Sequence, residues 1–542
     1  MGNNNDDSIF IWMFVTAFRL AILPFQVTWW LLKLFLRVML WLLSTSIGRA
    51  LLVVLLILLG LGWLANQIIS LFPPPQPEIT LRVLYTNDEE GYLLPSPCVN
   101  TGGVIPLMQM WSLREGCGEE NCLILSGGDI FISAPISSHK YENEPIGMPV
   151  AEVMQAMGYD AVVIGNHELD FELQDGKLTN NLAWLRDKSK LTLLSANYVP
   201  KSGGDFALPY KIIEKQGLRI GVVGLGTRDV VTVTSLHVAE TILDLSKLDY
   251  EKALQTTVED IQRKEQVDVL ILVGHVSPSD LQAIRNVKGN RNKFVLFLGG
   301  HDQKRFAFPV TGTESQKVYN FHESQILEEG GFWNGYIRID LRFKDNRFVD
   351  GDYTFFDNPF EKPIDQLMTE KFNNPKVQQV ADIVRKWYQQ LYSDPPIGTL
   401  HKPLENPGQA IVNGWYEMYA TKYNLDVALS NAGGFRGCLP AGKVYEVDVR
   451  GVLPFDNSLV ILKVSGDKLR QAVTSGKAIV VGLERVSPIT DSKTYTVLTN
   501  SFIAEGGDGF PFKGVPTTTV AANWQDPTVE WFRRYLKSSD NR

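Results

Sequence analysis

The sequence predicts an α/β protein that follows an N-terminal membrane segment, and two observations lead to this fold class. Five short apolar runs, each of the length of a buried β-strand, end at loops rich in Gly, Asp, Asn and His. Residues 50–69 carry no charge, and a run of about twenty such residues is long enough to cross a hydrocarbon core about 30 Å thick.

The five predicted strands share one pattern, in which an apolar run is followed by groups that bind hard or borderline metals. The strands and loops are Ile79–Tyr85 before Thr86–Gly91, Cys122–Leu125 before Ser126–Asp129, Ala161–Ile164 before Gly165–Asp170, Val267–Val273 before Gly274–His275, and Phe294–Leu298 before Gly299–Gln303. Open α/β sheets place their binding sites beyond the carboxyl ends of the strands. We therefore expect the five loops to converge on one metal centre.

The donors in these loops are oxygens and imidazoles without a thiolate, which favours Zn, Mn, Mg or Fe over a soft-metal or iron–sulfur site. The expected ligands are Asp88, Asp129, Asn166, His275 and His301, with Glu90 and Gln303 as further candidates; the alternative for Glu90 is a solvated acid. This set is large enough for two divalent ions. Two ions about 3.5–4 Å apart clamp the attacking and leaving oxygens of a phosphoryl displacement, so the predicted chemistry is phosphoester hydrolysis.

From Ile79 onward the chain resembles the 5'-nucleotidase family of calcineurin-like metallophosphatases, which includes UDP-sugar hydrolases and cyclic-nucleotide phosphodiesterases. The strand-end motifs match in order, and three later motifs match as well: Asn431–Arg436, Leu453–Asn457 and Glu505–Phe510. The resemblance implies a metallophosphatase sandwich followed by an α+β C-terminal 5'-nucleotidase domain.

The resemblance also implies individual roles at the metal centre. Asp129 corresponds to a carboxylate that bridges both ions, and His167 with Asp170 corresponds to a catalytic dyad that stabilises charge without binding metal. The remaining ligands implied are Asn166, His275 and His301 for one ion, and Asp88 and Gln303 for the other. Many members carry histidine where this chain has Gln303, although glutamine also occurs there.

In the second domain the resemblance implies a substrate site. Phe455 and Phe510 match two rings that sandwich a nucleobase, and Asn431, Gly433 and Arg436 match a loop near the base and phosphate. Without the resemblance, the two phenylalanines are better explained as core residues, because aromatic side chains near Pro and Gly commonly pack inside a domain.

Two departures from the family pattern bear on metal and substrate choice. The first motif of the family is Asp-x-His, whereas this chain has Glu90 in place of the histidine, and a carboxylate ligand favours harder ions than zinc. The family also tends to carry an arginine and a glutamate before the Asn-Gly-Gly loop, where this chain reads Leu404–Gln409. We therefore expect one phosphate contact to be missing.

The membrane segment is expected to be retained, because no small-residue cleavage site of the kind that ends a signal peptide follows residues 50–70. Residues 9–43 contain either a further span or a helix that lies in the membrane interface. Lys33, Arg37 and Arg49 precede the span, and cytoplasmic flanks are enriched in Lys and Arg. The catalytic part should therefore lie on the periplasmic or extracellular side of the cell membrane.

The predicted domains are a membrane anchor, a proline-rich linker, the metallophosphatase domain, a linker helix and the substrate-binding C-terminal domain. Their respective ranges are 1–72, 73–78, 79–355, 356–395 and 396–542. The linker helix is expected as one amphipathic helix between Pro363 and Asp394, because apolar residues recur there every three to four positions. The four cysteines lie in the outward part, where disulfides persist, and they allow three pairings, of which Cys117 with Cys122 is our first choice.

Charge limits the class of partner. Residues 1–78 carry four Lys or Arg and three Asp or Glu, which leaves a net charge of −9 on the rest of the chain, a poor match for nucleic-acid backbones. We expect the lipid bilayer and a nucleotide or small phosphoester as partners, and no nucleic acid polymer. The sequence gives no oligomeric state. The predicted function is a membrane-anchored, extracytoplasmic dimetal phosphohydrolase. The alternatives are an impaired nucleotide-binding protein of the same fold, or a hydrolase of cyclic nucleotides, UDP-sugars or a sulfur ester.

Overall fold

The computed structural model describes residues 29–41, 43–71, 78–117, 121–174, 177–235, 237–287 and 289–537. It forms two compact units, residues 1–76 and residues 77–542, and we describe each by itself. The predicted proline-rich linker lies outside the described residues, except for Glu78.

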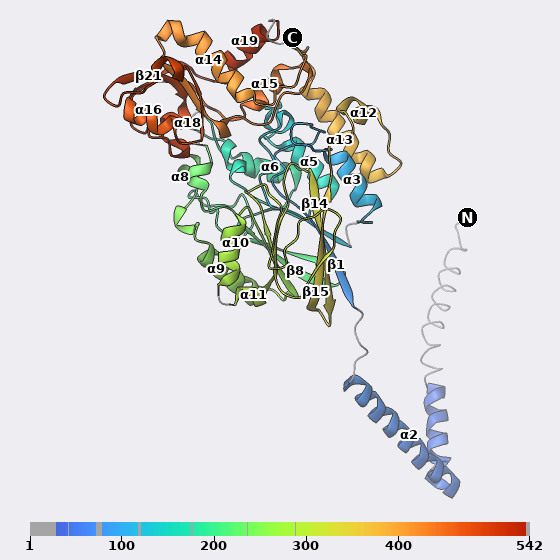
Figure 1. Cartoon of the computed structure of the whole chain (residues 1–542). Coiled ribbons are helices and arrows are strands. Elements are labelled where there is room, and N and C mark those ends of the chain that lie inside the picture. The colour runs from blue at the N-terminus through green and yellow to red at the C-terminus, as the bar shows by residue number, and fades with distance from the viewer. Residues whose placement is uncertain are drawn as a thin grey trace, which may run out of the picture. The chain divides into compact units, whose positions relative to one another are not determined.

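The first unit is helical where it is described. Residues 29–41 are helical, and helix α2 follows at Ser46–Leu71, drawn in blue in Figure 1. Within the described part of the chain, Ser46–Ala65 is the one stretch that is long and apolar enough to cross a membrane. Its Leu, Ile, Val and Trp side chains are exposed all around the helix, as expected of a segment that faces lipid. The predicted additional segment from residue 9 lies outside the described residues up to residue 28.

The second unit begins with two β-sheets that pack face to face. The first sheet has the strand order β12-β15-β14-β1-β2-β3-β6 and the second has the order β11-β13-β10-β9-β8-β7. The strands of the first sheet are β1 Ile79–Thr86, β2 Cys122–Ser126, β3 Ala161–Val163, β6 Leu193–Leu194, β12 Tyr319–Phe321, β14 Gly335–Lys344 and β15 Arg347–Asp357. Those of the second are β7 Tyr210–Lys215, β8 Leu218–Leu225, β9 Val269–Gly274, β10 Phe294–Gly299, β11 Phe306–Phe308 and β13 Gln325–Glu328.

A shared apolar core joins the two sheets, because alternate side chains of β1, β2, β8, β9 and β10 meet between them. Strands β1, β2 and β3 are parallel to one another, as are β8, β9 and β10. The carboxyl ends of each parallel set therefore share one edge of the sheet. All five strands predicted from the sequence are present, with ends that differ by up to two residues.

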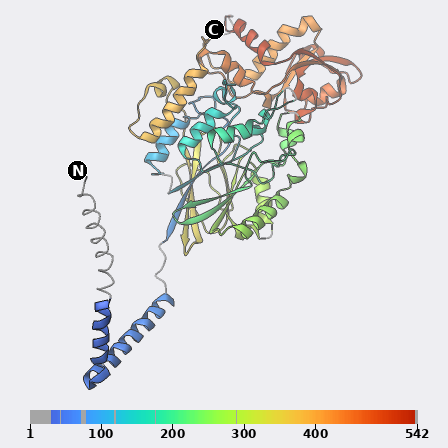
Figure 2. The same ribbon diagram turned by 180° about the vertical axis from the view of Figure 1, so that it is seen from behind.

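Helices cover both outer faces of the sandwich. The helices on the first sheet are α3 Val104–Leu113, α5 Met148–Met157, α6 Asn181–Ser189 and α13 Pro375–Leu391, and those on the second are α9 Tyr250–Lys264 and α10 Pro278–Asn286. Figures 1 and 2 both show α13 beside α3, although the two helices are far apart in sequence. The predicted metallophosphatase sandwich is thereby confirmed.

The C-terminal part contains a separate five-stranded sheet with helices on both faces. Its strand order is β20-β17-β21-β19-β22, and its strands are β17 Val427–Asn431, β19 Leu459–Ser465, β20 Ala478–Val481, β21 Thr494–Asn500 and β22 Thr517–Ala521. One face packs on α14 Pro407–Tyr423, α15 Glu446–Val452 and α19 Gln525–Tyr535, and the other packs on α16 Gly466–Val473 and α18 Ser501–Ala504. This arrangement is the α+β domain that the sequence predicts.

The predicted single linker helix is wrong in one respect, because the structure has two helices, α12 Ile364–Thr369 and α13. The two helices are separate because α13 has its own N-terminal cap. Asn374 accepts hydrogen bonds from the amides of Lys376 and Val377, and Pro375 occupies the first helical position. The predicted apolar stripe is buried along α13, which packs against α3 and α5.

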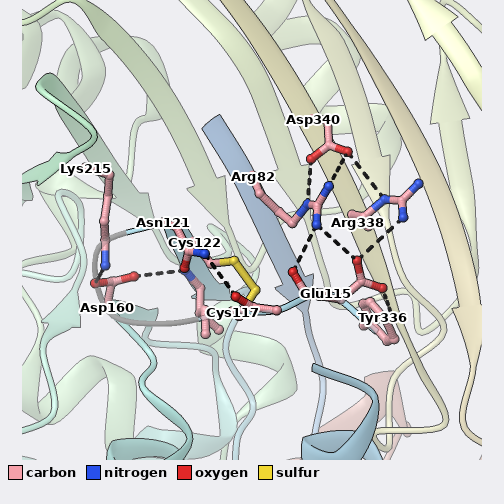
Figure 3. The surroundings of a disulfide bond; sticks show 12 residues. Arg82, Glu115, Cys117, Asn121, Cys122, Asp160, Lys215, Tyr336, Arg338 and Asp340 are labelled. Carbon is pink, nitrogen blue, oxygen red and sulfur yellow. Dashed lines mark hydrogen bonds and ion pairs between the residues drawn. A yellow bond between two sulfur atoms is a disulfide. The ribbon is translucent and has the colours of Figure 1, made fainter. Parts of the chain in front are cut away.

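The four cysteines form two disulfides. Cys117 pairs with Cys122, as we expected, and Figure 3 shows this bond near Arg82 and Glu115. Cys98 pairs with Cys438, which joins the sandwich to the C-terminal domain across 340 residues of sequence.

Candidate metal centre and substrate cavity

Three predicted ligands from different strand ends meet at one point. The Nε2 atom of His275 lies 3.0 Å from Oδ2 of Asp129 and 3.2 Å from Nδ1 of His301. One ligand atom from each residue lies within 4.8 Å of the other two, and this spacing can hold a metal ion. The convergence follows from the topology, since β2, β9 and β10 all end at this edge of the sandwich.

Two further predicted ligands each leave one buried oxygen without a hydrogen-bond partner. In Asp88, Oδ2 accepts hydrogen bonds from Asn87 Nδ2 and from the His301 amide, while Oδ1 has no partner. In Asn166, Nδ2 donates to the Val233 carbonyl, while Oδ1 has no partner. An unsatisfied buried polar atom costs about 1–3 kcal/mol, and a bound cation would remove that cost. The residues present therefore fit a metal centre.

The orientation of His275 suits metal binding. Its Nδ1 lies 3.0 Å from the carbonyl oxygen of Gly127, so Nδ1–H donates to that oxygen and Nε2 faces the other ligands. A backbone carbonyl that holds the second ring nitrogen is the usual support for a ligating histidine.

The backbone is strained at most of the predicted ligands. Asp88, Glu90, Asp129, His301 and Gln303 have φ values of 51°, 45°, 54°, 86° and 55°. This left-handed region is uncommon for residues other than glycine, and such strain concentrates at functional sites. The loops are therefore bent to direct these side chains toward one another.

Two glycines allow the close approach of the ligand loops. A Cβ on Gly165 would lie 2.1 Å from Oδ1 of Asp129, and a Cβ on Gly300 would lie 3.0 Å from Oδ2 of Asp88. Any other residue at Gly165 would displace the Asp129 carboxylate. The glycines after the strands therefore leave room for the ligand side chains as well as ending the strands.

The charges at the centre are balanced between acids and imidazoles. Burial would lower the pKa of His275, but the carboxylates of Asp129 and Asp88 raise it to about 10. Burial and the neighbouring His275 lower the pKa of His301 to about 4, and burial raises the pKa of Asp88 to about 6. A cation that binds His275 must displace the proton on Nε2, because a ligating imidazole is neutral.

The predicted catalytic pair lies beside this centre. Nδ1 of His167 is 2.6 Å from Oδ2 of Asp170, and the backbone amide of His167 donates to Oδ1 of Asp129 at 2.9 Å. On the other side of the ring, Nε2 lies 3.0 Å from Nη2 of Arg436, which belongs to the C-terminal domain. The two domains therefore share one site.

A cavity of about 700 Å³ opens over these residues and is lined by both domains. The predicted residues that line it are Asp129, Asn166, His167, Asp170, His301, Gln303, Asn431, Gly433, Arg436 and Phe455. The Arg436 guanidinium lies over the Phe455 ring at 5.5 Å. The cavity therefore joins metal-binding groups to an aromatic face.

Comparisons with known proteins agree with this geometry. Residues 396–484 match the family model described as 5'-nucleotidase, C-terminal domain. The Silent protein UshA(0) of Salmonella typhimurium is 24% identical over 508 residues, which cover 80% of this chain and 86% of that protein. A 5'-nucleotidase of Vibrio parahaemolyticus is 24% identical over 521 residues, which cover 84% of this chain and 89% of that protein.

The chain belongs to the 5'-nucleotidase family. The crystal structure of a 5'-nucleotidase precursor from Thermus thermophilus has the same fold, with a TM-score of 0.67 at 20% identity, and covers 84% of this chain and 97% of that one. As a member of the 5'-nucleotidase family, the protein is a metal-dependent phosphoester hydrolase.

Glu90, where this chain departs from the 5'-nucleotidase pattern, is buried among residues of the site. Glu90 is only 2% exposed, so the alternative of a solvated acid is wrong. Its carboxylate accepts hydrogen bonds from Ser133 Oγ and Gln303 Nε2, and its Oε1 lies 3.7 Å from Nη1 of Arg436. Its role as a ligand stays a prediction.

The structure does not bring Phe510 to the cavity. Phe510 is 5% exposed and packs against Phe512 in the core of the C-terminal domain, so its role against a nucleobase is not supported. Phe502 lines the cavity instead, and its ring lies so close to Gly507 that a Cβ there would be 2.4 Å away. The signal in the sequence was Gly507, whose missing side chain makes room for the Phe502 ring.

Sequence reasoning also missed Glu168, which ties two ligand loops together. Its buried carboxylate accepts hydrogen bonds from the amides of Asp129, Ile130 and Gly165 at 3.0, 2.8 and 2.6 Å. These three bonds fix the loop of Asp129 against the loop of Asn166. The sequence shows an acid directly after His167, but it does not show that the Glu168 side chain points away from the cavity.

Proposed function

We propose that this protein is a membrane-anchored, extracytoplasmic phosphohydrolase that uses two divalent ions to remove phosphate from nucleotides or related small phosphoesters. The observation that carries the proposal is the shared cavity, in which the cluster of Asp129, His275 and His301 faces Arg436 and Phe455 of the C-terminal domain. In this proposal residues 79–355 hold the metals, residues 356–395 link the domains and residues 396–542 hold the substrate.

The proposed ligands divide between two ions, with Asp129 bridging both. One ion is held by Asn166, His275 and His301, and the other by Asp88, Gln303 and Glu90. The unpartnered oxygens of Asp88 and Asn166 support this division, since each needs a partner that the protein does not supply. When bound, Zn, Mn or Mg supplies an activated water and neutralises charge on the phosphoryl oxygens.

The side chains that do not bind metal stabilise the transition state. Asp170 holds the Nδ1–H of His167, so that Nε2 faces the cavity beside Nη2 of Arg436. In this contact Nη2 donates to Nε2 of a neutral ring; with a phosphoryl group between the two side chains, a protonated His167 and the Arg436 guanidinium would both donate to the oxygens that gain negative charge. Burial would lower the pKa of His167, but Asp129 and Asp170 raise it, which favours the protonated form.

Substrate binding falls to the aromatic side of the cavity. We assign the two base-binding rings to Phe455 and Phe502, with Asn431, Gly433 and Arg436 beside them. Asn431 is fixed by hydrogen bonds with Asp508 and Asn500, which makes it a rigid part of the wall. The activity named for the Vibrio parahaemolyticus relative, 5'-nucleotidase, supports nucleotides as the substrate class.

The proposed location follows from the N-terminal unit and the disulfides. The apolar stretch Ser46–Ala65 is exposed on all sides, with Lys33 and Arg37 before it and Arg49 in its first turn. Two disulfides in the second unit favour an oxidising compartment, because such bonds are rare in the cytosol. We therefore propose that the helix is kept as an anchor and that the catalytic unit faces outward.

The test is product formation by the full-length protein in detergent over a substrate panel, followed by chromatography of substrate and products, with phosphate release as an added readout for the nucleoside monophosphates. The panel contains nucleoside monophosphates, a 2',3'-cyclic nucleotide, a UDP-sugar and a sulfur ester, each with chelator or with added Mn, Zn or Mg. We expect turnover of nucleoside monophosphates that needs metal. Stoichiometric nucleotide binding without turnover under any metal would make this an impaired binding protein, and faster turnover of another ester would change the substrate.

A further inference from the structure

The disulfide between Cys98 and Cys438 connects the two halves of the active site. Cys98 lies in the loop after β1 that also carries Glu90, and Cys438 lies two residues after Arg436. The Cα atoms of the two cysteines are 5.5 Å apart. The bond therefore joins the loop of a predicted metal ligand to the loop of the arginine that enters the cavity.

Arg436 makes its functional contacts across the domain boundary. Its Nη2 lies 3.0 Å from Nε2 of His167, its Nη1 lies 3.7 Å from Oε1 of Glu90, and its Nε has no hydrogen-bond partner. Both partners belong to the sandwich domain. Arg436 can keep these contacts only while the C-terminal domain stays in place.

A second covalent connection restricts how the domains can move. The chain itself already joins them between Asp357 at the end of β15 and Gly398 at the start of β16 (Gly398–Leu400). Two bodies joined at one point can rotate in any direction, whereas two bodies joined at two points can rotate only about the line through both. Two residues span at most about 7 Å, so Arg436 stays close to that line whatever rotation remains.

Close packing around the disulfide is consistent with a fixed arrangement. A Cβ on Gly437 would lie 2.9 Å from the Tyr92 hydroxyl, and a Cβ on Gly451 would lie 2.5 Å from the Pro135 ring. Both pairs cross the domain boundary. The backbone of the C-terminal domain therefore lies directly against side chains of the sandwich at both glycines.

We infer that the Cys98–Cys438 disulfide is a positioning element for the reaction, which keeps Arg436 close to His167 whatever rotation of the C-terminal domain remains. This inference rests on the proposed phosphohydrolase function. The second disulfide, Cys117–Cys122 (Figure 3), provides a matched control, because Cys122 begins β2 whereas Asp129 follows the other end of that strand.

The experiment is a double-mutant cycle on the full-length protein. Removing the interdomain bond with Cys98→Ala/Cys438→Ala should lower kcat/KM about 10-fold or more, since small misplacements of a positioned group cost up to about 100-fold. The control Cys117→Ala/Cys122→Ala should stay within about twofold. In an Arg436→Ala background, removal of Cys98 and Cys438 should also change kcat/KM by no more than about twofold, because coupled residues are not additive.

Amide hydrogen exchange gives a readout that does not depend on activity. Exchange in residues 431–437 should rise in Cys98→Ala/Cys438→Ala and stay unchanged in the control. Unchanged exchange and kcat/KM in that variant would overturn the inference, as would an equal loss of kcat/KM with and without Arg436. A wild-type protein that hydrolyses nothing would instead refute the proposed function, while exchange would still test the restraint.

A folded reference is available if the double variant does not fold. In the Cys117→Ala/Cys122→Ala protein, the interdomain bond is the only disulfide left, because the chain has four cysteines. Reduction of this folded protein with a phosphine should raise exchange in residues 431–437 and lower kcat/KM to the same extent as the substitution. No change after complete reduction, verified by thiol counting, would overturn the inference.

Discussion

The imidazole of His167 is held by Asp170, with 2.6 Å between Nδ1 and Oδ2. The other carboxylate oxygen of Asp170 accepts a hydrogen bond from the Ser235 amide, so the acid is itself fixed. The ring therefore has one orientation, in which Nε2 faces the cavity. This geometry separates a group that stabilises charge from a group that binds metal.

The role of His167 can be tested by truncation. His167→Ala should lower kcat by about 10²–10⁴, the range for a positioned acid, base or charge stabiliser. Bound metal, measured by elemental analysis, should barely change, because the contact with Asp129 comes from the backbone amide. His322→Ala, at an exposed histidine, is the control. Loss of a full metal equivalent in His167→Ala would make His167 a ligand.

Metal dependence should follow the unpartnered oxygens. Chelator should abolish activity, and a divalent metal should restore it, since the ligands are oxygens and imidazoles that bind without a proton. Asn166→Ala removes one unpartnered oxygen. It should weaken the binding of one metal ion more than the binding of the other, as measured by calorimetric titration. Full activity in a preparation shown to be metal-free would contradict the mechanism.

Glu90 should set the choice of metal. A carboxylate in place of an imidazole adds negative charge beside Asp88 and Asp129, which favours Mn or Mg over Zn and makes a bound water less acidic. Glu90→His should restore a preference for Zn and move the acidic limb of the pH–rate profile to lower pH. Glu90→Gln should weaken one site only. If both variants keep the metal stoichiometry, metal preference and pH profile of the wild type, Glu90 is not a ligand.

Phe502 and Phe510 should respond differently to truncation. Phe502→Ala removes a ring that lines the cavity and should raise KM for a nucleotide by roughly 10-fold, since stacking a base is worth about 1–3 kcal/mol. Phe510→Ala removes a core side chain and should lower the free energy of unfolding by about 3–5 kcal/mol. Thermal unfolding and steady-state kinetics of both variants check this contrast, and the reverse result would return the base-binding role to Phe510.

The orientation in the membrane can be tested by labelling with an impermeant thiol reagent in intact cells. A cysteine at Lys537, an exposed position in the second unit, should be labelled. A cysteine at Ser44, on the basic side of the apolar helix, should be labelled only after the membrane is opened. The opposite pattern would reverse the orientation inferred from Lys33, Arg37 and Arg49.

Much of the candidate site could be predicted because it lies at strand ends. Each of Asp88, Asp129, Asn166, His275 and His301 follows an apolar run, and parallel strands bring such ends together whatever else the chain does. The break before α13 was missed, although Asn374 followed by Pro375 is a local signal for a helix start. Helix α12 ends at Thr369, and capping by Asn374 then starts α13 at Pro375.

The sequence by itself determined the α/β class, the apolar segment and the candidate metal donors, because strand periodicity and loop chemistry are local properties, while the sandwich was implied by the resemblance to the 5'-nucleotidase family. Only the tertiary structure decided that Phe502 rather than Phe510 faces the cavity, that Glu90 is buried, and that Cys98 pairs with Cys438. Each of these depends on which residues of two domains, 340 positions apart in the case of the disulfide, come into contact. A local sequence pattern carries no information about such contacts, because they are set by how the two domains pack.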